Sequence, residues 1–201
     1  MITSEDIAIV SDHKFFMAKA RISGKIRNTL DQLLPALREE LGNRPLIAPD
    51  LFSLEPFQFV KGEHLEKCPY QYLDFPRFYT KSEKLAFRSL FWWGHHIVFS
   101  LLVEGGHLRR YKENLINRYG DLADRHICLG ISPSLWEWKQ GAGYTIELTR
   151  TKKSEVAAVL ANRPFFKLSI FVQWNHQSVI NNTIVDQGRQ ALRAMLPVIT
   201  P

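Results

Sequence analysis

The most constraining feature of the sequence is a set of segments in which large apolar residues recur at every second position. Residues 84–93 and 165–174 follow this two-residue period, which is typical of β-strands. Residues 97–103 are apolar on both faces, as expected for a central strand that helices cover on at least one side. Gly94 lies between residues 84–93 and residues 97–103, which predicts two neighbouring strands or one strand bent at that glycine. A chain with these segments needs a sheet at its centre.

A further hairpin is predicted over residues 135–150, with its turn at the glycines near residue 141. The apolar faces of its two strands stay together only if Trp138 lies opposite Ile146. The same register places Glu137 opposite Glu147.

Apolar residues at steps of three and four predict a helix from Ile22 to Leu41. Pro35 lies inside this helix and is expected to kink it or to split it in two. Similar spacing and stop signals predict further helices at about 108–120, 151–162 and 178–196. Prolines and a glycine punctuate residues 45–77, so this segment is expected to be mostly irregular, with regular structure only in short pieces such as Phe57 to Lys61.

Together these elements predict one α+β domain over residues 1–201. We expect a mostly antiparallel central sheet of about five to six strands, with helices packed against it and an aromatic-rich core. The chain length is close to that of one ordinary domain, and 45% of the residues are hydrophobic. This composition excludes a disordered or collagen-like chain.

The charge and the cysteines limit the classes of function. The net charge is +6, and most of the basic excess lies in the second half of the chain, which makes a nucleic-acid partner conceivable but not favoured.

Cys68 and Cys128 are too few for a disulfide framework or a zinc site, so we expect free thiols, no cofactor and no metal ion. The N-terminus lacks the pattern of an export signal, and no apolar run is long enough to span a membrane. We therefore expect a cytoplasmic location.

Two stretches carry a resemblance to a known family. The chain reads Leu-Asp-Phe-Pro-Arg at residues 73–77 and Phe-Trp-Trp-Gly at residues 91–94. With the residues around them, these stretches cover about a quarter of the chain, and they resemble a family of uncharacterised bacterial proteins that share LDxPR and FWWG and have no assigned function. The resemblance implies a bacterial cytoplasmic setting and assigns no catalytic role to any residue.

The first of these stretches contains candidate ligand-binding residues. Asp74 and Arg77 flank Pro76, which favours an extended or turn conformation, so their side chains can meet or reach the strand that carries Arg88. A salt bridge that fixes the loop to the sheet is the simpler interpretation. The alternative is a ligand-binding site in which an arginine holds an anionic group.

The weak catalytic candidates are His95, Glu137 and Glu147. His95 and His96 are adjacent, so on a strand they point to opposite faces and cannot both bind one metal ion. Two glutamates opposite each other on a sheet repel, and one of them can then keep its proton to higher pH. Such a pair can act as acid and base, whereas a solvated face screened by nearby lysine is the simpler interpretation.

Two basic clusters are expected at the starts of helices. They form an anion-binding surface if they lie together, and a scattered solvated surface if they do not. The two clusters comprise Arg109, Arg110 and Lys112 in one helix, and Arg150, Lys152 and Lys153 before the next.

Three hypotheses about function follow, and the sequence does not decide whether the protein is an enzyme. The first is a protein that binds a small, anionic molecule, or an enzyme, with a pocket where the central strands meet residues 45–80. Its polar groups would be Arg77, Arg88, His95, Glu137 and Glu147. The second is a binder of nucleic acid or another polyanion. The third is an interaction module or homodimer that uses Trp136 and Trp138.

Overall fold

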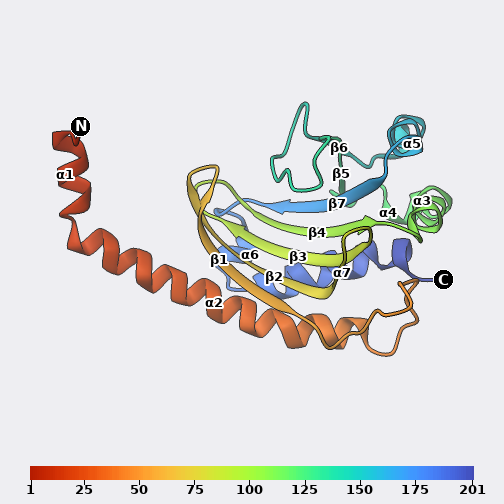
Figure 1. The fold of residues 1–201 in the computed structure, drawn as a ribbon, viewed down its shortest axis with the longest axis horizontal. Helices are drawn as coiled ribbons and strands as arrows, with labels where there is room; N and C mark the ends of the chain where they lie inside the picture. Colours follow the sequence, from red (N-terminus) through yellow and green to blue (C-terminus); the bar gives the residue numbers. More distant parts are fainter.

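A computed structural model describes all 201 residues and contains a single seven-stranded antiparallel sheet (Figure 1). The strands lie in the order β1-β2-β3-β4-β7-β5-β6. They are β1 (Gln58–Leu65), β2 (Cys68–Tyr79), β3 (Lys84–Trp92), β4 (Ile97–Glu104), β5 (Cys128–Gly130), β6 (Thr145–Glu147) and β7 (Phe165–Val172). The helices are α1 (Ser4–Val10), α2 (His13–Leu41), α3 (Leu108–Asn117), α4 (Tyr119–Leu122), α5 (Lys153–Ala161), α6 (Gln177–Ile180) and α7 (Ile184–Ile199), with a 3₁₀ turn at Arg150–Lys152. The predicted α+β class is confirmed, with one strand more than expected.

The central strands are those that the alternating pattern predicts. β3 and β4 are neighbours that pair from Lys84 opposite Glu104 to Phe91 opposite Ile97. Gly94 lies in the turn between them with a φ of 72°, a value that glycine adopts without steric cost. β7 pairs with β4 along its whole length. The prediction of two neighbouring strands, rather than one bent strand, is therefore confirmed.

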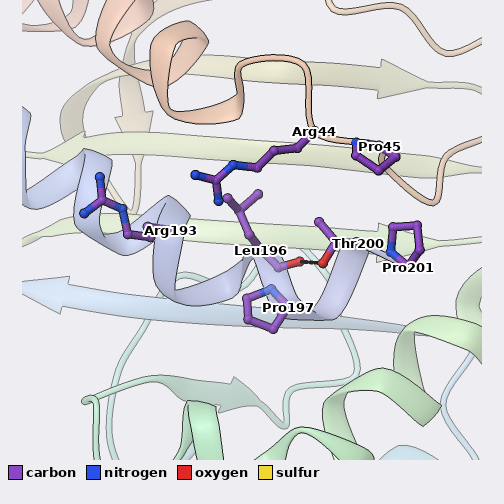
Figure 2. A pocket seen from close by; sticks show the side chains of 7 residues that line it. All are labelled: Arg44, Pro45, Arg193, Leu196, Pro197, Thr200 and Pro201. Atoms are coloured by element: carbon purple, nitrogen blue, oxygen red, sulfur yellow. Dashed lines mark hydrogen bonds between the residues drawn. The ribbon is translucent and has the colours of Figure 1, made fainter.

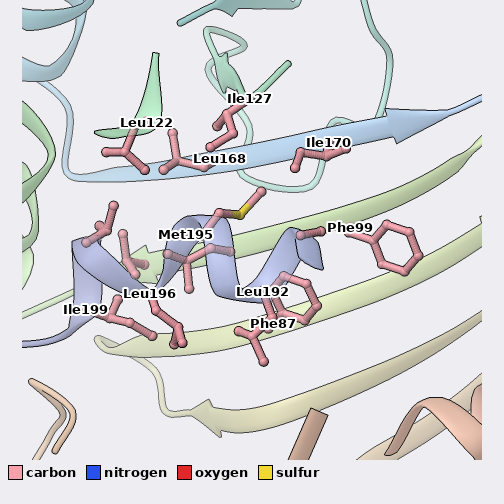
Figure 3. Packing of buried hydrophobic residues seen from close by; sticks show 14 of the residues in the cluster. Phe87, Phe99, Leu122, Ile127, Leu168, Ile170, Leu192, Met195, Leu196 and Ile199 are labelled. Carbon is pink, nitrogen blue, oxygen red and sulfur yellow. The ribbon is translucent and has the colours of Figure 1, made fainter. Parts of the chain in front are cut away.

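One face of the sheet packs against α2 and α7 and contains the larger hydrophobic core (Figures 1 and 3). Phe87 of β3 and Phe99 of β4 belong to this core with Leu192 and Met195 of α7, and Phe87 lies beside Leu192 (Figure 3). Gly188 marks the closest approach of α7, because a Cβ there would lie 2.7 Å from Phe99 and 2.8 Å from Leu33 of α2. This face is closely packed at the point where two helices and the sheet meet.

The first long helix differs from its prediction in two ways. α2 begins at His13 and runs without interruption to Leu41, so Pro35 does not split it. Five leucine and isoleucine residues of α2 are buried on the side that faces the core, and this packing outweighs the hydrogen bond that proline cannot make. These residues are Ile26, Leu30, Leu33, Leu37 and Leu41.

The prediction of a mostly irregular segment over residues 45–77 is wrong from residue 58 onward. β1 and β2 form a hairpin whose turn residues, Glu66 and Lys67, both have positive φ angles. Glu-Lys is not the Asn-Gly type of sequence that announces such a turn. Pro76 lies where the pairing of β2 with β3 shifts register, so its missing N–H costs no ladder hydrogen bond.

The predicted hairpin over residues 135–150 is also wrong. β6 pairs with β5, which places Glu147 opposite Cys128 and not opposite Glu137. Residues 131–144, which contain Trp136 and Trp138, form a loop over the sheet instead of a strand. In this loop Trp138 is buried but Trp136 is more exposed than Glu137, so the alternation of tryptophan with charged residues does not correspond to the two faces of a strand.

The C-terminal helix is interrupted before its main part. α6 ends at Ile180 and α7 begins at Ile184, with Asn182 between them at a φ of 57°. Ile180 is exposed, whereas the rest of the predicted inner face, from Ile184 to Met195, is buried. None of the helices combines the length and the apolar character needed to cross a membrane.

Candidate functional site

A row of polar side chains crosses the face of the sheet that α2 and α7 do not cover. Residues that pair across neighbouring strands share a face, so the register defines the row. From β2 to β6 it contains Asp74, Arg88, Ser100, Ser169, Cys128 and Glu147. The first five are almost completely buried. Buried polar groups in the middle of a sheet need an explanation, because transferring them from water is costly unless they are paired.

Arg88 and Asp74 form a bidentate ion pair inside the protein. Arg88 Nε and Nη2 donate to the two carboxylate oxygens of Asp74, each at 2.7 Å. The Tyr79 hydroxyl donates to Asp74 at 3.0 Å. Burial opposes the charge of Arg88, but its hydrogen bonds with Asp74 and the attraction of that carboxylate raise the pKa of Arg88 above its usual value. Burial and the nearby carboxylate also raise the pKa of Tyr79, so its hydroxyl keeps its proton.

Aromatic rings surround the guanidinium group of Arg88. Its Cζ lies 3.7 Å from the ring centroid of Tyr72 and 5.2 Å from the centroids of both Trp136 and Trp138. Cations within about 6 Å of a ring face are attracted by its quadrupole. The arginine is therefore held by a carboxylate at its end and by rings along its plane.

Lys167 of β7 places a second cationic group beside Arg88. Its Nζ lies 4.0 Å from the centroid of Trp138, the same ring that Arg88 approaches. The side chain is 5% exposed, and Nζ donates to the carbonyl oxygens of Leu135, at 3.0 Å, and of Glu137. No carboxylate lies within ion-pair distance of this amine. A protonated Lys167 is thus a buried cation without an anionic partner.

The surroundings of Lys167 change its proton affinity. Burial lowers the pKa of Lys167 to about 7, and the nearby charge of Arg88 acts in the same direction, while Glu137 partly opposes it. Near neutral pH the amine is therefore present in both its charged and its uncharged form. A lysine with these properties can bind an anion when protonated or act as a nucleophile when it is not.

Residues 131–144 cover the row, and side-chain donors hold much of this covering loop. Arg163 donates to the carbonyls of Ile131 and Ser132, and His96 Nε2 lies 2.9 Å from the carbonyl of Trp138. Together with Lys167, these residues attach the covering loop through its backbone oxygens. Leu135 and Trp138 pack against the smaller hydrophobic cluster on this face, whereas Trp136 is 44% exposed.

The structure brings together all three predicted ligand-binding residues. Asp74 and Arg88 form the buried pair, and Arg77 lies at its margin, where its Nε donates to Gln58 at 3.0 Å. The Arg77 guanidinium also lies 5.2 Å from the ring of Tyr79. The salt bridge that the sequence suggested exists, but between Asp74 and Arg88 and not between Asp74 and Arg77.

The three catalytic candidates are not brought together. His95 lies in the β3–β4 turn, stacked on Trp92 with ring centroids 3.6 Å apart, and Trp92 is about 13 Å from Arg88 along β3. Glu147 lies four strands away, about 19 Å across the sheet, and contacts His126 at 3.0 Å. Glu137 accepts the N–H groups of Trp138 and Lys139 with its own carboxylate. The hypothesis that a glutamate pair acts as acid and base is therefore wrong.

The two basic clusters lie at opposite ends of α5. Lys112 donates to the carbonyl of Arg163, just beyond the C-terminal end of α5, at 2.7 Å, while Lys153 begins the helix. Nine residues of helix separate these ends by about 14 Å. Arg109 pairs with Glu113, and Arg150 pairs with Asp124, so part of the charge is already compensated. Arg110 and Lys152 are exposed.

An open pocket of about 360 Å³ lies elsewhere, beside the C-terminal end of α7 (Figure 2). Arg44 and Arg193 line it, and both contact Glu40, at 3.5 Å and 2.5 Å. The Arg193 pair joins α2 to α7, and Arg44 pairs with Glu40 from the segment that follows α2. The arginines of this cavity therefore have a structural explanation, whereas Lys167 does not have an ionic partner.

No group of three or more histidine, cysteine, aspartate or glutamate side chains lies together in a way that could hold a metal ion. Comparisons of the chain with protein-family models, curated proteins and solved structures found no match. The resemblance to the bacterial family with LDxPR and FWWG stays a prediction.

The sequence pattern does not identify Lys167, Tyr72, Tyr79 and Trp138 as members of one site. Lys167 carried a usable signal, because it is the one charged residue in the strand Phe165–Val172. A lysine in the middle of a strand that is apolar on both sides is expected to be buried, and a buried lysine has a perturbed pKa. The local sequence pattern does not predict that the covering loop folds over Arg88 and Lys167.

Proposed function

We propose that the protein binds a small anionic ligand at Arg88 and Lys167, beneath the covering loop of residues 131–144. The observation that supports this proposal is that the buried Lys167 amine donates only to backbone carbonyls and forms no ion pair with a carboxylate. A buried ammonium group is unstable without an anion, and an anionic ligand would supply the missing partner. Arg88 adds to the positive potential of the site, which favours an anion. Because Arg88 is already paired with Asp74, it does not need the anion as an ion-pair partner.

Entry of the ligand requires movement of the covering loop. Lys167 donates to two carbonyls of this loop, and a carboxylate or phosphate oxygen can replace them because it accepts hydrogen bonds more strongly. The rings of Trp136, Trp138 and Tyr72 provide apolar walls for the remainder of a ligand. The site thus favours a small molecule with one anionic group and an apolar or aromatic body.

Calorimetric titration with inorganic phosphate, succinate and phenyl phosphate tests this proposal. We expect phenyl phosphate to bind most tightly, and its affinity to fall by up to tenfold per pH unit above about pH 7 as Lys167 loses its proton. Lys167→Met is expected to abolish binding. Lys84→Met is the matched control, because Lys84 is also a poorly exposed lysine of the sheet but is paired with Glu104 at 2.5 Å.

Two outcomes would contradict the proposal. One is binding that Lys167→Met and Lys84→Met change equally. The other is binding only of DNA or RNA, with strong salt dependence, that survives Lys167→Met and is lost when Arg110 and Lys153 are changed to glutamate. The second outcome would favour a polyanion-binding surface instead.

A further inference from the structure

The N-terminal arm, defined as residues 1–22, projects past the edge of the sheet and away from the rest of the fold (Figure 1). It contains α1 and the first part of α2, and no residue of α1 is buried. Nine of the thirteen large hydrophobic residues that are exposed in the whole chain lie in the arm. They are Met1, Ile2, Ile7, Ile9, Val10, Phe15, Phe16, Met17 and Ile22. Such a concentration of exposed apolar side chains marks an interaction surface.

The apolar stripe of the arm continues the buried stripe of α2. Ile26 is buried against the core, and steps of four and three residues lead back from it to Ile22, Lys19 and Phe15. Lys19 forms an ion pair with Glu63 of β1 at 2.6 Å, which shows that this side of the helix faces the sheet as far as Lys19. Phe15 therefore lies on the core-facing side of α2 but beyond the point where the core ends.

The sequence specifies the helices of the arm locally. Thr3 and Asp6 form a capping box at the start of α1, and Asp12 accepts the N–H of Phe15 at the start of α2. A seven-residue helix without buried residues is marginal on its own, since isolated helices shorter than about 12–15 residues are weakly populated in water. α1 thus needs a contact that a single chain does not provide.

The charges of the arm are arranged for antiparallel contact with an identical arm. Residues 1–12 contain three acidic side chains and no lysine or arginine, whereas residues 13–27 contain five basic side chains and no aspartate or glutamate. Three of these five, Lys14, Arg21 and Lys25, make no ion pair within the chain. Antiparallel packing with Phe15 opposite Ile22 places Asp12 of each arm opposite Lys25 of the other, whereas parallel packing would place like charges together.

The base of the arm offers a place for an aromatic side chain. A hollow of about 190 Å³ is lined by Ile22, Trp93, Gly94 and Trp174. A cavity of about 150 Å³ is enough to hold a benzene molecule. Phe15 of a second copy can therefore face Ile22 and this hollow when two arms pack antiparallel. The 22 residues of each arm also match the roughly 20–30 residues a side of a standard interface.

We propose that the arm binds the arm of a second copy of this chain, in a homodimer with two-fold symmetry and antiparallel arms. Each arm then covers the apolar stripe of the other, and the contact is made twice. The surface is distinct from the one that the sequence suggested, since Trp138 is buried and Trp136 contacts Arg88.

Sedimentation over a range of concentrations tests the dimer. We expect the wild-type protein to sediment at twice the 23.3 kDa mass of the chain at concentrations of about 100 μM and to dissociate on dilution. Phe15→Glu/Phe16→Glu should weaken the dimer by at least about 100-fold, because two aromatic anchors are lost. Leu51→Glu is the matched control, since Leu51 is 86% exposed but lies outside the arm, and should leave the dimer intact. Both positions are exposed, so circular dichroism should show an unchanged fold.

Disulfide trapping tests the antiparallel arrangement. In a Cys68→Ser background, copies with Phe15→Cys are mixed with copies with Ile22→Cys and oxidised. We expect a mixed disulfide between the two variants and little linkage between like copies, because seven helical residues, about 10 Å, separate like positions. Linkage of like with like, or a wild-type protein that stays monomeric, would overturn the proposal. So would a monomer whose Phe15 and Phe16 are needed to bind anionic lipid vesicles.

Discussion

The two faces of the sheet differ in what holds them together. The face covered by α2 and α7 is a continuous hydrophobic core, and its main buried ion pairs, around Glu40, have arginines that reach the surface. The opposite face has a smaller hydrophobic cluster and a row of buried polar residues under a loop. Apolar packing is sufficient for stability on the first face. The second face keeps charged groups where apolar residues of similar volume would be at least as stable, which points to a function for them.

Breaking the buried ion pair should have the largest effect on stability. Arg88→Met leaves Asp74 buried with only the Tyr79 hydroxyl, and we expect the free energy of unfolding to fall by about 3–5 kcal/mol. On the helical face, Arg193→Met should cost much less, because Arg193 is 56% exposed and Glu40 keeps two other arginines. Urea denaturation measures both changes. Equal losses would remove the contrast between the two faces.

The second largest effect on stability is expected from the titration of Lys167. Between pH 7 and 10.5 the unfolded chain holds the lysine proton and the folded chain has released it, so stability rises with pH, by about 1.4 kcal/mol per unit. Below pH 7 both states are protonated and the contribution is constant. We expect Lys167→Met to remove this slope and Lys84→Met to retain it, as measured by urea denaturation at several pH values. An unchanged slope in Lys167→Met would show that the amine is not buried in solution.

Adding a methyl group at two helical glycines tests how closely α7 packs on the sheet. Gly188→Ala places a Cβ against Phe99 and Leu33, and we expect a loss of about 1–3 kcal/mol from overpacking. Gly24→Ala is the matched control in α2, where no atom lies within 4 Å of the new Cβ, and should stabilise the protein by about 0.5–1 kcal/mol. Thermal denaturation separates the two. If Gly188→Ala were also stabilising, the packing of α7 would be looser than described.

The smallest effect is expected outside both faces. Arg150 pairs with Asp124 at 3.2 Å, but its side chain is 81% exposed. Arg150→Ala should change the free energy of unfolding by less than about 0.5 kcal/mol and leave the affinity for phenyl phosphate unchanged. Urea denaturation and calorimetric titration measure the two quantities. A marked loss of affinity would move the anion site from Lys167 to the basic clusters.

The sequence predicted the parts of the fold that depend on regular patterns. β3, β4 and β7 were predicted because their apolar residues alternate, and the buried side of α2 because its apolar residues recur at helical spacing. Most of β1 and β2 was missed because Gly62, Pro69 and Pro76 are signals of irregular structure when read alone, and because Glu66-Lys67 does not have the usual sequence of a hairpin turn. Their effect depends on strand pairing, which is not a local property.

The candidate site was only partly predictable for a similar reason. Asp74, Arg77 and Arg88 were found because charged residues stand out within and beside apolar strands. The false pairing of Glu137 with Glu147 came from alternation in a segment that forms a loop. The role of Trp138 and the surroundings of Lys167 depend on where that loop folds back over the sheet, and residues more than 30 positions apart make those contacts.

The most direct test of the central claim is the titration of Lys167 by nuclear magnetic resonance, with labelled lysine and with Lys167→Met to assign the signal. We expect the amine to titrate near pH 7 in the free protein, and at higher pH when phenyl phosphate is bound, because the anion stabilises the charged form. A lysine signal that titrates at the ordinary value of about 10.4, or one that phenyl phosphate does not shift, would contradict the account of this site.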